Sequence, residues 1–189
     1  MQKLATPDEL LAQLADKLRT LLSDKAIHNP LMVGIHTGGA WVADKLYHQI
    51  NTSETTCSEP FFSEPLASLD ISFYRDDFSR IGMNPKVKPS DLPADVEDRH
   101  IILVDDVLHT GRTIRAAMNE LFDYGRPASI TLVCLIDRCG RELPLQADIV
   151  GAHVDLNEGE HIKLTGPEPL AFELQQNTAQ NASENEAME

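Results

Sequence analysis

Two apolar runs with a helical pattern between them constrain the fold of this 189-residue chain more than any other feature. Residues 101–104 read IILV and residues 130–136 read ITLVCLI. Between them, apolar side chains recur at helical spacing, and Gly125 can end that helix. Apolar strands without alternation are typical of sheets that helices cover on both faces. The pattern therefore predicts an α/β fold with a doubly wound, mostly parallel sheet. The predicted buried stripe of the helix consists of Ile114, Ala117, Met118, Leu121 and Phe122.

Earlier segments repeat the same alternation of strand and helix. Thr6-Pro7-Asp8-Glu9 has the form of a capping box before a leucine-rich helix. A strand is expected over Leu31–Ile35, followed by a turn at residues 36–39 and a helix over residues 40–50. Residues 69–74 alternate apolar and polar side chains, which predicts a strand with one solvent-exposed face.

Three loops are expected to meet at one edge of this sheet. Ligands on doubly wound sheets bind outside the carboxyl ends of the strands. Residues 36–39, 105–113 and 137–143 all follow predicted strands. The sequence therefore predicts a ligand site formed by these loops.

Two further segments do not read as regular elements. Residues 75–98 contain three prolines and many charges, which favours a long loop that covers a site. Residues 175–189 have few apolar side chains and are expected to form a disordered tail. One domain over residues 1–174 is the predicted organisation.

Charge and cysteine content exclude several classes of protein. Sixteen basic and 30 acidic side chains give a net charge of −14, which argues against broad electrostatic binding to nucleic acid or anionic membranes. No apolar segment approaches the ~20 residues of a membrane span, and the first residues lack the pattern of a secretory leader. Three irregularly spaced cysteines favour a reducing, cytoplasmic location.

The segment 105–113 combines two opposite chemistries. Asp105 and Asp106 follow a buried strand, and Thr110, Gly111 and Thr113 lie where the next helix begins. Backbone N–H groups at a helix start favour a phosphate, whereas carboxylates suit hydroxyl groups or a hard cation such as Mg²⁺. A ligand with a phosphate at one end and a diol or metal at the other fits both. The structural alternative is that the aspartates cap the helix and the glycine turns the chain.

The run IILVDDVLHTGRT resembles the 5-phosphoribosyl-1-diphosphate (PRPP) motif of type I phosphoribosyltransferases. LDISFYRDD, RTIRAAMNELFDYGRPASI and LIDRCGRELPLQADIVG further resemble the PyrR family, and the likeness covers roughly residues 7–174. Members of that family are uracil phosphoribosyltransferases, and some also regulate pyrimidine operons by binding messenger RNA. The resemblance implies a type I phosphoribosyltransferase core with a flexible loop at about 75–98 and a small hood at about 137–165.

The resemblance also implies roles for residues in the first two loops. Asp105 and Asp106 would hold the ribose hydroxyls, with Mg²⁺ bound indirectly or through PRPP. The glycines of the first loop would let the backbone approach the diphosphate; an ordinary strand-to-helix turn is the alternative. The pyrophosphate loop would be Thr37, Gly38 and Gly39, and the 5′-phosphate region Val107, Leu108, His109, Thr110, Gly111, Arg112 and Thr113.

Two other segments receive roles in the same way. Arg75, with Asp76 and Asp77, would begin the flexible catalytic loop and supply a cation for the leaving pyrophosphate; a surface salt bridge is the alternative for Arg75. Asp137 and Arg138 would lie in the hood over the base, with Ile162 as an apolar neighbour of uracil. Arg138 and Arg141 are equally interpreted as structural ion-pair partners.

The reaction implied is displacement of pyrophosphate from C1 of PRPP by N1 of uracil, which gives UMP. Asp105, Asp106 and Arg75 are the predicted catalytic residues, and a homodimer or larger assembly is expected. The chain departs from the family at His36-Thr37-Gly38-Gly39, where lysine-threonine-arginine-glycine is frequent. Without these two cations, either the affinity for PRPP is lower or the cationic contacts come from the long loop, which offers Arg75, Arg80, Lys86 and Lys88. Cys139-Gly140 also replaces a frequent glycine-histidine pair.

Other functions fit the same residues. The chain could be a UMP- or UTP-sensing attenuator that binds pyrimidine-operon mRNA, with weak or no catalysis. RNA binding needs clustered cations, and the first helix offers only Lys17 and Arg19. A third interpretation keeps the transferase but changes the base to orotate, hypoxanthine or guanine.

Overall fold

A computed structural model describes residues 4–52, 60–71, 90–92, 96–157 and 159–176. Arg75, Asp76 and Asp77, and most of the predicted loop 75–98, lie outside the described residues. Within the described part of the chain, no helix combines the length and apolarity that crossing a membrane requires.

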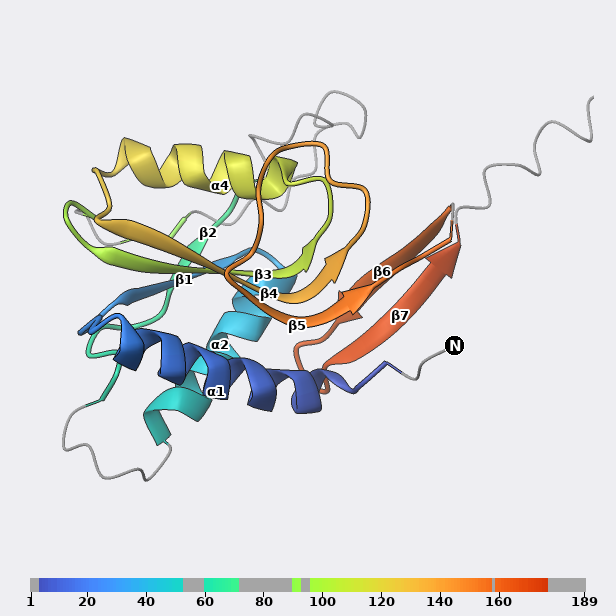
Figure 1. Ribbon diagram of the computed structural model, residues 1–189, viewed down its shortest axis with the longest axis horizontal. Coiled ribbons are helices and arrows are strands. Elements are labelled where there is room, and N and C mark those ends of the chain that lie inside the picture. Colours follow the sequence, from blue (N-terminus) through green and yellow to red (C-terminus); the bar gives the residue numbers. More distant parts are fainter. Residues whose placement is uncertain (1–3, 53–59, 72–89, 93–95, 158, 177–189) are drawn as a thin grey trace, which may run out of the picture.

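Five parallel strands form the central sheet (Figure 1). In chain order these are β1 (Leu31–Ile35), β2 (Ala67–Leu69), β3 (His100–Leu108), β4 (Ser129–Arg138) and β5 (Ile149–Val154). Their spatial order is β2-β1-β3-β4-β5, and each neighbouring pair is parallel. The carboxyl ends of β1, β3 and β4 therefore meet at one edge of the sheet, as the sequence predicts.

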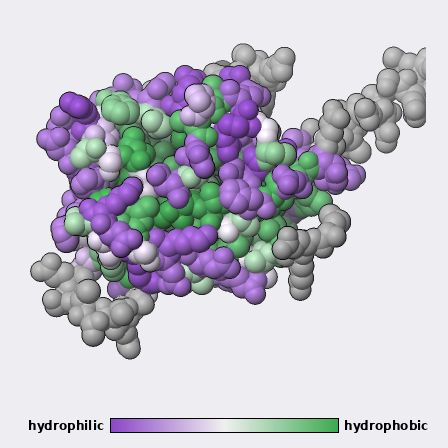
Figure 2. Space-filling view, viewed as in Figure 1, coloured by the Kyte–Doolittle hydropathy of each residue, from purple (hydrophilic) through white to green (hydrophobic). Residues whose placement is uncertain are grey.

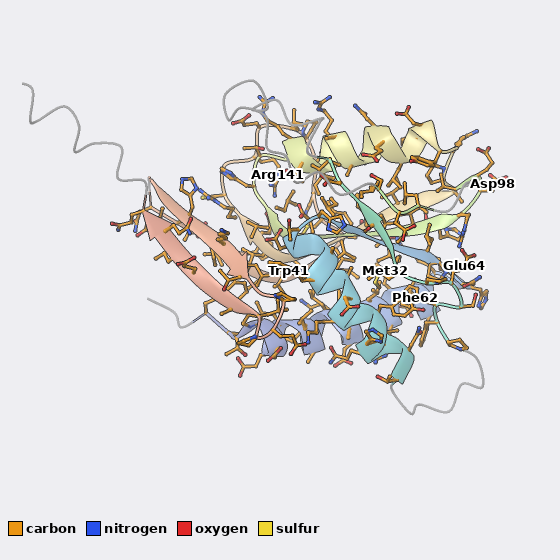
Figure 3. All side chains as sticks on the ribbon, turned by 180° about the vertical axis from the view of Figure 1, so that it is seen from behind. Met32, Trp41, Phe62, Glu64, Asp98 and Arg141 are labelled. Atoms are coloured by element: carbon orange, nitrogen blue, oxygen red, sulfur yellow. The ribbon has the colours of Figure 1, made fainter. Side chains whose placement is uncertain are left out.

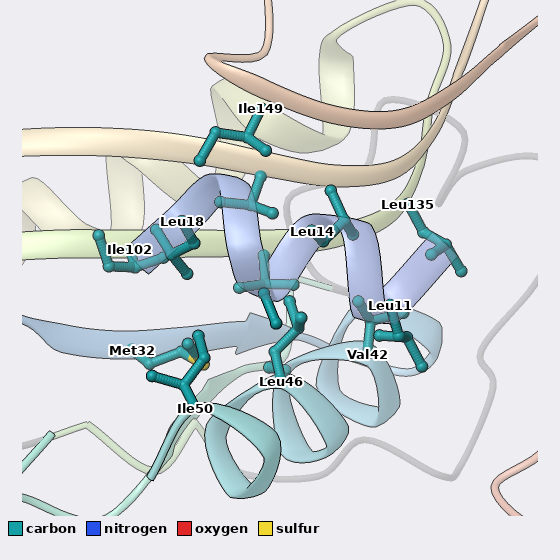
Figure 4. Packing of buried hydrophobic residues seen from close by; sticks show 14 of the residues in the cluster. Leu11, Leu14, Leu18, Met32, Val42, Leu46, Ile50, Ile102, Leu135 and Ile149 are labelled. Carbon is teal, nitrogen blue, oxygen red and sulfur yellow. The ribbon is translucent and has the colours of Figure 1, made fainter. Parts of the chain in front are cut away.

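Helices cover both faces of this sheet. α1 (Pro7–Asp24) and α2 (Gly38–Thr52) pack on one face, and α4 (Arg112–Asp123) packs on the other (Figure 1). Alternate residues of β3 serve the two cores: Ile102 joins α1 and α2, and Ile101 joins α4. Figure 4 shows the first core, where leucines of α1 face apolar side chains of α2 and Met32 of β1 lies beside Ile50. The predicted doubly wound architecture is confirmed.

The start of α1 follows the predicted capping box. The Thr6 hydroxyl accepts a hydrogen bond from the Glu9 backbone N–H at 3.3 Å, and the Glu9 carboxylate accepts one from the Thr6 N–H at 2.8 Å. Pro7 occupies the first turn, where its missing N–H costs no helical hydrogen bond. The apolar face that follows is buried against the sheet.

Two predicted strand boundaries are wrong. β3 runs to Leu108 instead of ending before Asp105, because pairing with β4 continues through Asp105, which lies opposite Cys134. β2 is only Ala67–Leu69, so the strand predicted over residues 69–74 begins earlier and ends before Asp70. Asp70 is buried rather than on a solvent-exposed face, and its N–H donates to the Ser90 hydroxyl at 3.1 Å.

The buried face of α4 is also displaced around the helix from the predicted one. Ile114, Ala117 and Leu121 are buried in the second core, whereas Phe122 is 52% exposed. Phe122 follows Leu121 by one residue, which turns it by about 100° around the helix axis. The buried face instead extends to the other side of the stripe, where Ala116 and Glu120 are buried.

A separate two-stranded sheet stands beside the main one. Its first strand lies within the segment 137–165 that was predicted to form the hood, and its second strand follows that segment. β6 (Glu160–Thr165) and β7 (Ala171–Gln176) pair antiparallel. The connection between them contacts α2, because Lys45 forms an ion pair with Glu168 and the Trp41 ring lies against Gly166. Figure 3 labels Trp41 on the end of α2 that faces this hairpin. β7 includes Gln175 and Gln176, the first two residues of the predicted tail.

Candidate functional site

A cavity of about 360 Å³ lies at the carboxyl edge of the sheet, between the β1–α2 turn (residues 36–39), the end of β3, the start of α4 and β6. It brings together seven predicted site residues from four separate segments. These are Thr37, Gly38, Asp105, Asp106, Val107, Thr113 and Ile162. Its remaining lining residues are His36, Trp41, Ile71, Lys163 and Leu164.

The two aspartates lie at the end of β3. Asp105 is 5% exposed, and its Oδ1 accepts the Asp106 N–H at 3.0 Å. The Asp106 carboxylate lies directly against Gly38, where an added Cβ would be 2.2 Å from Oδ2. The cavity thus has adjacent carboxylates on one wall, in contact with the loop that forms another.

Glycine brings the β1–α2 turn close to β3. A Cβ at Gly39 would lie 2.6 Å from the Val104 carbonyl oxygen and 2.9 Å from the Asp105 Cα. Both contacts are with backbone, which cannot swing aside as a side chain can. The close approach that the sequence assigns to these glycines is therefore made to β3 itself, and it fixes the turn beside the carboxylates.

The β3–α4 turn (residues 109–111) leads into α4. Gly111 is the N-cap residue with φ of +91°, a conformation that favours glycine. Gly111 supplies no side-chain cap, so the backbone N–H groups that follow Arg112 can serve an anion. Thr113 lines the cavity, and the Thr110 hydroxyl accepts from the Arg112 N–H at 3.3 Å.

Residues 139–145, which we call the strap, lie against the β3–α4 turn. The Thr110 carbonyl accepts hydrogen bonds from the backbone N–H groups of Glu142 and Leu143, at 3.0 and 3.1 Å. Arg141 donates to the His109 carbonyl and to Asp137, the latter at 2.5 Å. Arg112 pairs with Glu142 at 2.7 Å.

Arg138 and His109 occupy the space between the strap and β6. An Arg138 guanidinium nitrogen lies 3.2 Å from His161 Nδ1, and its buried Nε has no partner within the described residues. Burial lowers the pKa of His109, and the nearby positive charge of Arg138 lowers it further. His109 therefore favours its neutral form more strongly than an exposed histidine does.

Cys134 lies opposite Asp105 in the pairing of β3 with β4. Burial raises the pKa of the Cys134 thiol well above its usual value.

Sequence comparison decides the family. A model of the phosphoribosyl transferase domain matches residues 6–165. The Bifunctional protein PyrR of Nitrosococcus oceani is 56% identical over 168 residues, which cover 89% of this chain and 90% of that protein. The Bifunctional protein PyrR of Pseudomonas aeruginosa is 52% identical over 90% of this chain and 94% of its own length. This chain belongs to the PyrR family.

Solved structures share the fold of this PyrR-family chain. A purine phosphoribosyltransferase from Pyrococcus horikoshii aligns with a TM-score of 0.55 at 22% identity, over 78% of this chain and 82% of that one. A hypoxanthine phosphoribosyltransferase of Trypanosoma cruzi aligns with a TM-score of 0.60 at 21% identity, over 85% of each chain. The type I phosphoribosyltransferase fold is thus confirmed.

Several predicted site residues of this PyrR-family member lie outside the cavity lining. Gly39 packs on β3, and Leu108 is buried in the second core. The β3–α4 turn contacts the strap, and Asp137 pairs with Arg141. The predicted residues that do not line the cavity are Gly39, Leu108, His109, Thr110, Gly111, Arg112, Asp137 and Arg138, and Arg75 lies outside the described residues.

Sequence reasoning missed Trp41 and Lys163. Trp41 follows Thr37 by four residues, and its N–H donates to the Thr37 carbonyl at 3.4 Å, so helical spacing would have placed it above that residue. Lys163 is adjacent to Ile162 on β6 and carried no signal of its own. It is the one lysine or arginine among the lining residues of the described cavity.

The donor set of the site fits Mg²⁺ only together with a ligand. Asp105 and Asp106 supply carboxylate oxygens, the type that Mg²⁺ prefers. Within the described residues, no group of three or more histidine, cysteine, aspartate or glutamate side chains could hold a metal ion. A metal here would complete its coordination with water and ligand oxygens, as is usual where Mg²⁺ accompanies a phosphorylated substrate.

A larger hollow of about 780 Å³ lies elsewhere, between α1 and β5. Of the predicted site residues, it contains only Asp137. Figure 2 shows apolar side chains gathered in the middle of the face of the molecule that is turned toward the viewer in Figure 1. Because it lacks the aspartate pair and both turns, it is separate from the site described above.

Proposed function

We propose that this chain is a uracil phosphoribosyltransferase, which makes UMP and pyrophosphate from uracil and PRPP. One observation carries the proposal: in a PyrR-family chain, the Asp105–Asp106 pair shares a cavity with the β1–α2 turn and the start of α4. Carboxylates, glycine-rich backbone and a helix start are the three groups needed for a diol, a diphosphate and a monophosphate.

The arrangement assigns each part of PRPP to a wall of the site. The carboxylates of Asp105 and Asp106 accept hydrogen bonds from the ribose hydroxyls. Backbone N–H groups at the start of α4, with the Thr113 hydroxyl, bind the 5′-phosphate. Thr37 and Gly38, on the wall of the cavity that the β1–α2 turn forms, face the diphosphate.

The base lies against the apolar wall that β6 contributes. Ile162 lines the cavity together with Trp41, so a flat pyrimidine can pack between apolar groups. Arg138 and Asp137 lie at the end of β4, next to β6 and the strap, and bound the hood side of the site. The choice of uracil follows from family membership, because the aligned solved structures include purine and hypoxanthine transferases.

In the reaction, N1 of uracil forms a bond to C1 of PRPP as the bond between C1 and pyrophosphate breaks, and the proton of N1 is released to solvent or to the departing pyrophosphate. Asp105 and Asp106 fix the ribose through its hydroxyls and place negative charge near the positive charge that develops on the sugar. Mg²⁺, when bound with PRPP, would neutralise charge on the leaving pyrophosphate. Trp41, Ile162 and Leu164 exclude water from the reacting centre.

The leaving group needs cations that the β1–α2 turn does not supply. This turn reads His36-Thr37-Gly38-Gly39, and Gly38 occupies the position of a frequent family arginine. Lys163 provides one cation within the described cavity. We assign the remaining contacts to Arg75 and the other basic residues of the loop 75–98.

Turnover tests the proposal directly. UMP formation from uracil and PRPP would be measured with Mg²⁺ present or chelated, for the native protein and for Asp105→Asn/Asp106→Asn. Loss of the carboxylates should lower turnover by at least about a hundredfold. Circular dichroism of both proteins controls for folding. UMP binding without turnover in the native protein would contradict catalysis and favour a nucleotide sensor.

Regulation of a pyrimidine operon through its mRNA is the second proposed function, because the relatives at 52–56% identity are called bifunctional. The two cations predicted for this role on α1 are engaged within the fold. Lys17 donates to the Val150 carbonyl at 2.7 Å, and Arg19 donates to Asp16 at 3.1 Å and to the Gln49 carbonyl at 2.6 Å. RNA phosphates would therefore contact other cations.

Salt-dependent retention of a pyrimidine-leader RNA tests this function. Each phosphate contact releases counterions, so a steep fall of affinity with salt is expected if the protein binds RNA through a basic face. A leader with the same composition in scrambled order is the control. Equal retention of both RNAs would contradict specific regulation.

The organisation of the whole chain is also proposed. We assign residues 1–176 to one phosphoribosyltransferase domain, with a hood at about 137–165 and a flexible loop at about 75–98, and residues 177–189 to a tail, which begins two residues later than the sequence predicts because Gln175 and Gln176 belong to β7. A cytoplasmic homodimer or larger assembly is the proposed form. Light scattering after size-exclusion chromatography measures that assembly, and a monomer would contradict it.

A further inference from the structure

The β3–α4 turn is held by the strap more than by its own helix. The strap is residues 139–145, and the turn is residues 109–111. Two backbone N–H groups of the strap, from Glu142 and Leu143, donate to the Thr110 carbonyl at 3.0 and 3.1 Å. Gly111 packs against side-chain carbons of the strap, because a Cβ there would lie 3.4 Å from Leu143.

Arg141 joins this turn to the central sheet. One of its terminal nitrogens donates to the His109 carbonyl, and the other donates to Asp137 Oδ1 at 2.5 Å. The side chains of Arg141 and Asp137 are only 23% and 13% exposed. Because Asp137 belongs to β4, the guanidinium ties the first carbonyl of the turn to a rigid strand. Figure 3 labels Arg141 near the start of α4.

The turn has few other supports. Its N-cap residue, Gly111, supplies no side-chain cap, and the hydrogen bond from the Arg112 N–H to the Thr110 hydroxyl is long, at 3.3 Å. The Arg112–Glu142 pair is half exposed on both sides, so solvent weakens it. The orientation of the N–H groups at the start of α4 therefore depends on the strap and on its one guanidinium.

We propose that Arg141 is a positioning residue for the 5′-phosphate, a role that rests on the proposed function. It is not among the residues that line the described cavity, and both of its terminal nitrogens have protein acceptors. Arg141 acts through the His109 carbonyl. It holds the turn in the conformation that directs its N–H groups at the phosphate.

Affinity for UMP relative to uridine measures this role. The two ligands differ only in the 5′-phosphate, so the ratio of their dissociation constants reports on the turn and cancels general damage to the protein. Calorimetry would compare the native protein with Arg141→Gln, Arg141→Lys and Arg126→Gln. Arg126 is exposed at the opposite end of α4, so its variant controls for the loss of one positive charge.

Arg141→Gln should weaken UMP binding about tenfold and leave uridine binding nearly unchanged, since a charge-assisted hydrogen bond to a partly buried carbonyl is lost. Arg141→Lys should fall between, because an ammonium cannot bridge both acceptors with the geometry of a guanidinium. Arg126→Gln should match the native protein. In turnover assays, the KM for PRPP should rise more than kcat falls.

Two results would overturn the inference. An unchanged ratio of UMP to uridine affinity in Arg141→Gln, with tight UMP binding in the native protein, would show that Arg141 only stabilises the fold. A native protein that binds UMP no more tightly than uridine would remove the proposed phosphate site, and the role of Arg141 with it. If Arg141→Gln does not fold, Arg141→Lys decides by the same ratio.

Discussion

The β1–α2 turn and the β3–α4 turn leave the same edge of the sheet toward helices on opposite faces, but different contacts hold them. The first is fixed by the absence of side chains: Gly39 touches the backbone of β3, and Gly38 touches Asp106. The second is fixed by hydrogen bonds and charges from the strap. The β1–α2 turn thus depends on close backbone packing, and the β3–α4 turn depends on polar contacts with the strap. Separate substitutions can therefore remove one kind of support without the other.

Adding a side chain to the β1–α2 turn should have the largest effect on turnover and stability. Gly39→Ala places a Cβ 2.6 Å from the Val104 carbonyl oxygen, so the turn must move away from β3. We expect turnover to fall about a hundredfold and the free energy of unfolding to drop by about 1–3 kcal/mol. Steady-state kinetics and urea unfolding measure the two quantities.

Gly159→Ala is the matched control for this substitution. An added Cβ there meets nothing within 4 Å, although Gly159 has φ of +82°, so only local backbone strain is introduced. Native turnover in Gly39→Ala would show that the first turn is not fixed by close packing.

The second turn should respond to acid through His109. Burial and Arg138 lower the pKa of this histidine in the folded protein, so the unfolded chain binds its proton at higher pH. As pH falls below about 6.5, the unfolded state takes up that proton first, and the native protein loses stability. His109→Gln should flatten this dependence, as thermal unfolding midpoints between pH 7.5 and about 5 would show.

Since seven histidines contribute to the whole-protein profile, His48→Gln serves as the control. His48 is an exposed histidine of α2, with its ring 3.4 Å from Asp44. Identical pH profiles for the native protein and His109→Gln would contradict a role for burial at this position.

The smallest effect is expected from the exposed ion pair of the second turn. Glu142→Gln removes the pair with Arg112 but keeps the backbone hydrogen bond from residue 142 to Thr110. Because both side chains are half exposed, the loss of stability should stay below about 0.5 kcal/mol and vanish in about 0.5 M salt. Glu173→Gln, on exposed β7, is the control for the charge change in the same urea titrations. A large, salt-independent loss would mean that the pair is a main support of the turn.

Sequence patterns predicted the elements that depend on interactions between residues close together in the chain. The Thr6–Glu9 capping box, the apolar runs of β1, β3 and β4, and the stop at Gly125 each depend on neighbours in sequence. The aspartate pair and the β1–α2 turn were predicted to share a site because parallel strands align their carboxyl ends. The structure places Thr37, Gly38 and both aspartates around one cavity at that edge.

Other features depend on partners that are far away in the sequence. β3 continues past Asp105 because β4 pairs with it, and the apolar pattern of β3 contains no sign of that partner. Lys163 lines the cavity because a second sheet packs beside α2. The sequence left Arg141 open as an ion-pair residue; its bond to Asp137 confirms the pair, and its bond to the His109 carbonyl appears only once the strap is folded.

The hairpin β6–β7 shares no strand pairing with the five-stranded sheet, yet it supplies Ile162 to the cavity. Under the proposed function, the diol and phosphate contacts would come from the sheet and its helices, whereas the wall beside the base would come from the hairpin. Mutations in the hairpin can therefore change which base is accepted without altering the sheet that handles PRPP. Under the proposed function, two properties of the enzyme could therefore change separately: its preference for a base through the hairpin, and its affinity for PRPP through the sheet.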